Sequence, residues 1–457
     1  MRGDDQADCP DGLAPYRSDV PRDSRTIAVV GGGASAVLLA AALSDEARPG
    51  SRPHIVVIER EEAVGPGLAY GRADGHHLLN SPAGRMGSTE RRPEGFVEWS
   101  AANGHEIGSD DFAPRRLYGE YLVATFAELA RSSAGLIRHV RDEAVSIDGE
   151  DRRWSVRLAG GDTVEADAVV LAVGNPRPGE IAAAARVIQD PWKVGALDGV
   201  GETDRVLLMG TGLTMVDIAT SLARKNPGLR MTATSRSMQL PHTHTLVTAD
   251  YESGFPAGRE WDSLGSLVSA FGRELRSASE SQVPWQHVVD AIRPQLGSLW
   301  SGLTLADRRR FLDHVARRWD VHRHRMAPAV SRELDDLVRT GRLRFDPAPD
   351  RESFDVVVNC TGPRSVAETG WNPAVDSLVA SGLLRPEALG LGVDVDSDLR
   401  PRSVDGCPSN GLFALGPALK GAFWEATAIP EIRTSAGAIA RYLTSGLVAN
   451  RQLAHVG

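Results

Sequence analysis

The chain has 457 residues, of which 42% are apolar and 24% charged, which suits a globular protein of two or three domains. Its net charge of −9 gives no reason to expect nucleic acid or an anionic membrane as a partner. No apolar run approaches the roughly 20 residues that a membrane span needs. Residues 1–24 are polar and lack a signal-peptide core, which predicts a disordered tail on a cytoplasmic protein.

The clearest motif is Gly31-x-Gly33-x-x-Ala36, which follows an apolar strand (26–30) and opens an Ala/Leu/Val-rich helix. In such a fingerprint the first glycine makes a tight turn and the second lets the backbone approach a pyrophosphate. The third, small residue lets helix and strand pack closely. A second predicted strand, residues 54–58, precedes Glu59, an acid placed to bind the hydroxyls of a ribose.

A glycine- and proline-rich segment follows at residues 65–71 and 76–87, and this composition argues against a helix or a central strand there. We expect an ordered loop in which Asn80 and the amides of 81–87 face a flavin ring; an ordinary surface loop is the alternative. Residues 116–132 have helical spacing, and strands are expected at 137–147, 154–158 and 163–173.

A second strand–glycine–helix unit begins at residue 205 and contains Gly210-x-Gly212, with Met215 where a small residue is usual. Its next strand ends in Ser235-Arg236 instead of an acid. An arginine there suits a 2′-phosphate and therefore NADPH, although one of many surface arginines is the competing interpretation.

Residues 250–330 break the strand–helix alternation and predict a helical insertion, with helices at 261–278, 283–296 and 305–324. The last of these is densely basic. It indicates either an electropositive wall for a phosphate or carboxylate or a solvated arginine face. His242-x-His244 and His322-x-His324 lack the additional ligands of a metal site, so no metal is expected.

The end of the chain returns to the first module. Residues 353–363 repeat the strand-to-glycine pattern of 167–176, and a last strand ends at Gly416. Lys420 then leads to a helix at 432–443, whose N-terminus would point at the first cofactor. The predicted cofactor contacts are Gly31, Gly33, Ser35, Ala36, Glu59, Arg60, Asn80, Met86, Gly174, Gly210, Thr211, Gly212, Arg236, Gly362 and Gly416.

These patterns predict an α/β protein with two Rossmann-like dinucleotide-binding domains and a helical insertion in the second. The expected FAD-binding domain comprises residues 25–200 and 350–457, and the expected NADP-binding domain comprises residues 201–349. The combination resembles the two-dinucleotide-binding-domain flavoproteins, in which the first module binds FAD and the second NAD(P)H. Within them, the segments 67–71, 78–82 and 320–328 are similar to a bacterial FAD/NAD(P)-binding group related to the class B, N-hydroxylating monooxygenases. Gly416-Pro417 replaces the usual Gly-Asp, which leaves the ribityl contact unassigned.

The resemblance implies an NADPH-consuming monooxygenase that acts through a C4a-(hydro)peroxyflavin on a nitrogen of a small amino-acid-like substrate, with O2 as the other partner. A flavin oxidoreductase without oxygen insertion and a non-enzymatic FAD-binding redox sensor are the alternatives. A homodimer is one possible assembly. No catalytic residue is evident beyond the candidates Asn80, Arg323, His324 and Lys420.

Overall fold

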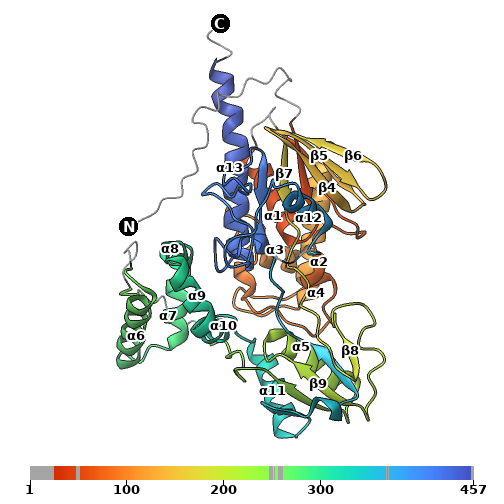
Figure 1. Ribbon diagram of the computed structural model, residues 1–457, viewed down its shortest axis with the longest axis vertical. Helices are drawn as coiled ribbons and strands as arrows, with labels where there is room; N and C mark the ends of the chain where they lie inside the picture. Colours follow the sequence, from red (N-terminus) through yellow and green to blue (C-terminus); the bar gives the residue numbers. More distant parts are fainter. Residues whose placement is uncertain are drawn as a thin grey trace.

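The computed structural model describes residues 25–47, 52–245, 251, 253–255, 261–366, 368 and 370–453, so the tail predicted over residues 1–24 lies outside it. Figure 1 shows two sheet-containing units along the long axis of the molecule and a group of helices beside them. The predicted α/β class is confirmed, because each unit is built on a five-stranded parallel sheet.

The sheet of the first unit has the order β13-β7-β1-β2-β3. All its neighbouring strands are parallel, and the four core strands consist mainly of buried Val, Ile, Leu and Ala. Such apolar runs are typical of parallel strands covered on both faces. Helix α1 packs against both α13 and α4. The bounds are β1 Thr26–Val30, β2 His54–Ile58, β3 Ile137–Val140, β7 Ala168–Leu171, β13 Leu412–Ala414, α1 Ala34–Glu46, α4 Arg115–Ser132 and α13 Ile429–Leu453.

A three-stranded antiparallel sheet, β4-β5-β6, extends the first unit. The strands predicted at 137–147 and 163–173 were wrong as single elements, because each divides between this sheet and the parallel one. The expectation that no helix forms at residues 65–71 was also wrong, since a short helix, α2, forms there. The bounds are α2 Gly67–Gly71, η2 Ala83–Arg85, α3 Gly95–Ala102, β4 Ala144–Glu150, β5 Arg153–Leu158, β6 Thr163–Ala166 and α12 Pro373–Ala380.

The sheet of the second unit has the order β11-β10-β9-β12-β8, and its strands are again all parallel. In both units the strand before the glycine turn, β1 or β9, lies at the centre, and the next two strands in sequence follow on one side of it. The edge strand on the other side differs, because β13 is the last strand of the first sheet in sequence and β8 is the first of the second. Strands β8 and β12 fall outside the predicted domain limits of 201–349, which must therefore be widened to include them. The bounds are β8 Arg186–Ile188, β9 Arg205–Met209, α5 Leu213–Lys225, β10 Arg230–Thr234, α11 Pro328–Arg339, β11 Leu343–Phe345, η4 Arg351–Ser353 and β12 Val356–Asn359.

The helical insertion forms a group of helices beside both units (Figure 1), and its Arg293 and Trp300 form hydrogen bonds with Glu431 and Gly421 of the first unit. The predicted helix at 305–324 is interrupted at Val315 and becomes two helices. No helix within the described part of the chain is long and apolar enough to cross a membrane. The bounds are α6 Leu264–Glu280, α7 Trp285–Ile292, η3 Arg293–Gln295, α8 Leu296–Gly302, α9 Leu305–His314 and α10 Ala316–Arg323; η5, Gly416–Leu419, precedes α13 in the first unit.

Candidate nucleotide-binding sites

The two glycine turns have nearly the same geometry. Gly31 has φ +98° and Gly210 has φ +126°, a left-handed backbone that favours glycine. A Cβ atom on Gly31 would lie 2.5 Å from the Ala172 carbonyl oxygen, and one on Gly210 would lie 2.4 Å from the Cys360 carbonyl oxygen. Glycine is therefore required at the same point of both modules, where the central strand ends beside its neighbour.

Both turns also leave a helix N-terminus open. Gly33 and Gly212 are the N-cap residues of α1 and α5, and neither receives a side-chain cap. The first amides of a helix have no partner within it and carry the positive end of the helix dipole. A Cβ on Gly33 would meet only the Gly67 Cα, at 3.8 Å, so the space in front of α1 is open. This arrangement fits a pyrophosphate on each helix.

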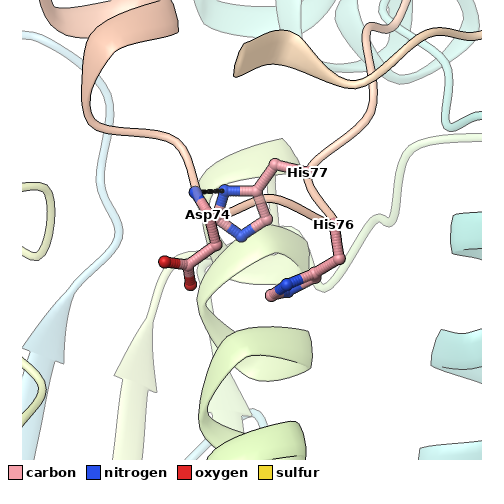
Figure 2. A group of neighbouring side chains, drawn as sticks. All are labelled: Asp74, His76 and His77. Carbon is pink, nitrogen blue, oxygen red and sulfur yellow. Dashed lines mark hydrogen bonds between the residues drawn. The ribbon is translucent and has the colours of Figure 1, made fainter. Parts of the chain in front are cut away.

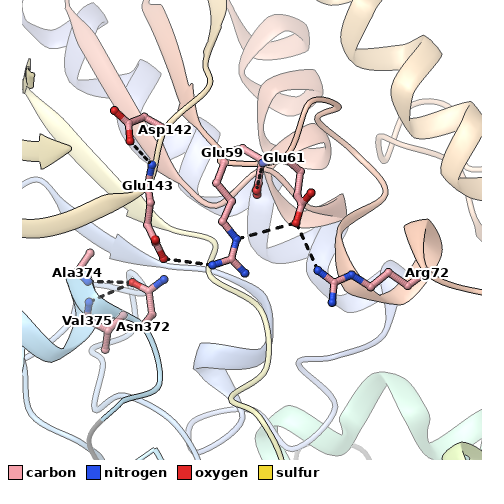
Figure 3. A network of polar contacts seen from close by, with 9 residues as sticks. Glu59, Glu61, Arg72, Asp142, Glu143, Asn372, Ala374 and Val375 are labelled. Carbon is pink, nitrogen blue, oxygen red and sulfur yellow. Dashed lines mark hydrogen bonds and ion pairs between the residues drawn. The ribbon is translucent and has the colours of Figure 1, made fainter. Parts of the chain in front are cut away.

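Glu59 lies at the end of β2, as the fingerprint predicts. Its Oε2 accepts a hydrogen bond of 2.7 Å from the Gly32 amide, and its Oε1 accepts one of 3.0 Å from the Glu61 amide. Arg60 pairs with Glu143, with 3.2 Å between Nη1 and Oε1. Figure 3 shows Glu143 in the surface network of polar contacts beside Glu59 and Glu61. The carboxylate of Glu59 thus supports the turn directly; its ribose contact and any role of Arg60 stay predictions.

The second module has no acid at the corresponding position. The Thr211 hydroxyl lies 2.7 Å from that of Ser235, which replaces the contact between Gly32 and Glu59. Arg236 follows and is exposed just beyond the end of β10. A neutral hydroxyl and a free guanidinium at this strand end can accept a 2′-phosphate, whereas a carboxylate would repel it.

Arg317 is a residue that the sequence analysis missed. It comes from α10 in the helical insertion, and its Nη2 donates hydrogen bonds to the carbonyl oxygens of Thr211 (3.1 Å) and Gln239 (2.5 Å). Its Nη1 lies 3.8 Å from the Cβ position of Gly212. A guanidinium is thus fixed at the open end of α5, where it can bind phosphate oxygens. Nothing in the sequence distinguished it from neighbouring arginines.

The structure also places several other residues that the sequence predicted as cofactor contacts. Gly416 has φ +73°, and a Cβ on it would lie 2.6 Å from the Ser35 Oγ, so the chain does return to the first turn. Ala36 and Met86 are buried in the first core. Gly174 and Gly362, which follow β7 and β12, each have open space where a Cβ would lie.

The two modules contact each other through the loop that follows Glu59. His244, from the second unit, has Nε2 2.9 Å from the Asn80 carbonyl oxygen. Burial, together with the charge of Arg325, lowers the pKa of His244 to about 4, so this imidazole is neutral near pH 7. Arg115 also forms an ion pair of 2.7 Å with Asp217 on α5. The loop expected to face the flavin is therefore held by the second module.

Asp74, His76 and His77 form a cluster in the same loop (Figure 2). The Nδ1 of His77 accepts a hydrogen bond of 3.2 Å from the Asp74 amide, and its Nε2 lies 2.8 Å from the Ser221 Oγ on α5. Both ring nitrogens of His77 are thus engaged, and a metal ion would have to displace one of these bonds. The geometry therefore favours a role in holding the two modules together over a role in metal binding.

The basic segment at the end of α10 is not an open electropositive wall. Arg323 is buried, and its Nε lies 3.2 Å from the Glu425 Oε2; Arg325 is buried and pairs with Asp290. Burial alone would raise the pKa of Glu425, but the charges of Arg323, His324 and Arg293 and the hydrogen bond from Trp319 together outweigh it and leave the pKa below its ordinary value. The expectation of a phosphate- or carboxylate-binding wall is wrong for these two arginines, because both already neutralise carboxylates of the protein.

Two further candidate catalytic residues, His324 and Lys420, lie beside the Arg323–Glu425 ion pair. Burial lowers the pKa of His324, with smaller effects from the charges of Glu425 and Arg323. Lys420 places its Nζ 4.8 Å from the centre of the Trp424 ring. The structure thus brings Arg323, His324 and Lys420 together, while Asn80 lies in the loop bound by His244.

Comparison with known proteins supports this description of the fold. Residues 28–176 match the model of the FAD-NAD(P)-binding family. The fold is similar to that of an ornithine hydroxylase from Pseudomonas aeruginosa, at 16% identity over 93% of this chain and 100% of the other, with a TM-score of 0.61. An ornithine N-hydroxylase from Kutzneria sp. 744 gives 17% identity over 94% of this chain and 100% of the other, with a TM-score of 0.60.

A cadaverine monooxygenase from Erwinia amylovora gives 12% identity over 93% of this chain and 95% of the other, with a TM-score of 0.63. No curated protein gives a significant sequence match. Residues 28–176 thus match an FAD-NAD(P)-binding family, and the overall fold is similar to that of solved ornithine hydroxylases.

Proposed function

We propose that the chain is an FAD-dependent, NADPH-consuming monooxygenase that oxygenates the nitrogen of an amine. The observation that carries this proposal is the repeat of one glycine turn in two parallel sheets, with an acid at the second strand of the first and an arginine at that of the second. The likeness in fold to two ornithine hydroxylases and a cadaverine monooxygenase supports the choice of chemistry.

In this proposal the α1 amides after Gly33 hold the FAD pyrophosphate, and Glu59 binds the adjoining ribose. Arg317 and the α5 amides hold the NADPH pyrophosphate, while Arg236 binds its 2′-phosphate. FAD, once reduced by NADPH, supplies the electrons with which O2 is activated. The overall reaction is R–NH2 + O2 + NADPH + H⁺ → R–NHOH + NADP⁺ + H2O, which balances in atoms and charge.

The protein's own residues position the cofactors and restrict water. His244 binds the Asn80 carbonyl as a neutral group, so it fixes the flavin-facing loop without adding a charge beside it. The His77–Ser221 contact and the Arg115–Asp217 pair also join the first unit to α5 at this junction. Exclusion of water from this junction would prevent loss of activated oxygen as hydrogen peroxide.

The proposal is tested with purified protein loaded with FAD, supplied with NADPH, ¹⁸O2 and a panel of amines. We expect a product that is heavier by one ¹⁸O atom, formed in proportion to the NADPH consumed. NADPH oxidation accounted for entirely by hydrogen peroxide, with every amine, would instead support an oxidoreductase without oxygen insertion. Tight FAD binding with negligible NADPH turnover would support a redox sensor.

A further inference from the structure

A large apolar cavity lies inside the helical insertion. Its volume is about 730 Å³, and it is bounded by residues of α6, α7, α8, α9 and α10. Protein interiors are normally packed as densely as organic crystals, whereas ligand sites occupy about 300–1,000 Å³. The helices instead form two separate hydrophobic clusters, and residues of both clusters line the cavity between them.

Aromatic side chains make much of the wall, and polar contacts hold several of them in place. Four tryptophans line the cavity: Trp285, Trp300, Trp319 and Trp424. The indole N–H of Trp300 donates to the Gly421 carbonyl at 2.7 Å, and that of Trp319 donates to Glu425 at 3.2 Å. Rings anchored in this way cannot readily collapse inward, so the space is preorganised for a ligand.

The cavity adjoins the nucleotide-binding modules at two places. Trp424 and the anchors Gly421 and Glu425 belong to the segment that directly follows η5, whose Gly416 lies against Ser35 at the first glycine turn. At another part of the wall, Trp285 makes an edge-to-face contact with His322 and lies under the guanidinium of Arg325, next to the segment that carries His244. The cavity wall is therefore linked to the first glycine turn through residues 416–424, and to the segment that carries His244 through His322 and Arg325.

An entrance is present on α6. Val268 lines the cavity and yet is 43% exposed, so the cavity reaches the surface there. The polar side chains in the wall include Ser279, His322 and Arg318, and no acidic side chain of the described residues lines it. A short diamine would therefore leave an ammonium group without an opposite charge in apolar surroundings, at a high cost in desolvation.

We propose that this cavity is the site for the apolar body of the substrate, and that the substrate is an amine carrying an aromatic or similarly large hydrocarbon group. This inference rests on the function proposed above and narrows its substrate class. It departs from the small amino-acid-like substrate that the family resemblance implies. Arg323 and Arg325, which could have bound the carboxylate of such a substrate, are paired with Glu425 and Asp290.

Binding is measured without turnover, on the full FAD-loaded chain in the absence of NADPH. The probes are 4-phenylbutylamine and cadaverine, and the signal is tryptophan fluorescence, because four of the nine tryptophans line the cavity. We expect a saturable change with 4-phenylbutylamine and at least about tenfold weaker binding of cadaverine. Similar affinity for the two probes, or no binding of 4-phenylbutylamine, would overturn the inference.

Two variants fill the cavity from different positions. Gly272→Leu adds a side chain on α6 where a Cβ would meet only Arg276 Nη1, at 3.7 Å, so the fold should tolerate it. Val268→Trp narrows the entrance. Each should weaken 4-phenylbutylamine binding about tenfold or more, whereas the control Arg273→Leu, at an exposed position outside the cavity on the same helix, should change it less than twofold. Equal effects of all three would overturn the assignment.

The outcomes separate this inference from the proposed function. Hydroxylation of cadaverine without binding of 4-phenylbutylamine would refute the cavity assignment and leave the monooxygenase proposal intact. Specific binding of 4-phenylbutylamine without oxygen transfer to any amine would support the cavity as an amine-binding site and refute the monooxygenase proposal. A fluorescence change that follows protein concentration without added amine would assign the cavity to a second copy of the chain and would also overturn the inference.

Discussion

Substitution of Gly31 and of Gly33 by alanine should affect different properties, although the two residues are close in sequence. Gly31→Ala should lower the stability of the fold, and Gly33→Ala should lower the affinity for FAD. Gly31→Ala places a methyl group 2.5 Å from the Ala172 carbonyl oxygen and forces φ +98° on an L-residue. The left-handed backbone alone costs about 1–2 kcal/mol. With the clash added, we expect the free energy of unfolding to fall by roughly 2–4 kcal/mol.

Gly33→Ala should leave the apoprotein almost unchanged. Gly33 has φ −76°, which any residue adopts, and its added methyl group would meet only Gly67 Cα at an ordinary 3.8 Å. We expect a stability change within about 0.5 kcal/mol. The methyl group would, however, occupy the space through which a pyrophosphate approaches the backbone, so FAD affinity should fall about tenfold or more, or about 1.4 kcal/mol.

The two effects are measured separately. Urea unfolding of the apoproteins, followed by circular dichroism, reports stability, and quenching of flavin fluorescence on titration with protein reports the FAD dissociation constant. Wild-type FAD affinity in Gly33→Ala would refute the position assigned to the pyrophosphate. An unchanged unfolding midpoint in Gly31→Ala would refute the close approach of the strand end to Ala172.

Three further predictions concern the second module and its junction with the first. Arg236→Ala should raise the KM for NADPH about tenfold or more and that for NADH less than twofold; equal losses would refute the 2′-phosphate contact. Arg317→Ala should weaken both nucleotides in parallel and leave FAD retention unchanged, as measured by the flavin absorbance of the purified protein. His244 has a folded pKa of about 4 against about 6.5 when unfolded, so the unfolded state binds the proton more tightly. Stability should therefore be full above about pH 6.5 and fall by up to ~3 kcal/mol towards pH 4; a urea-midpoint profile of the same slope in His244→Gln would contradict this.

Much of the site could be predicted from short stretches of sequence. Gly31, Gly33 and Glu59 are recognisable because the turn, the helix start and the strand end each depend on neighbouring residues. The same holds for Gly210 and Gly212, although Met215 replaces the usual small residue. Met215 is fully buried in the second core, so the module accommodates it by packing around a larger side chain.

Residues that act across long sequence separations could not be found in this way. Arg317 reaches Thr211 over 106 positions, and His244 reaches Asn80 over 164. Arg323 looked like a surface cation because nothing in its local sequence indicates Glu425 as a partner. The domain limits failed for a similar reason: β12 follows the helical insertion by many residues, yet its hydrogen bonds pair it with β9.

The sequence by itself determined the two turns that face the cofactors, because the conformational freedom of glycine and the alternation of strand and helix act over a few residues. Only the tertiary structure decided which arginines are free and which are neutralised, how the loop after Glu59 is held by the second module, and that the inserted helices enclose a cavity. These properties depend on burial and on distances between segments that meet only in the folded chain. The substrate class, which the cavity would set, belongs to this second group.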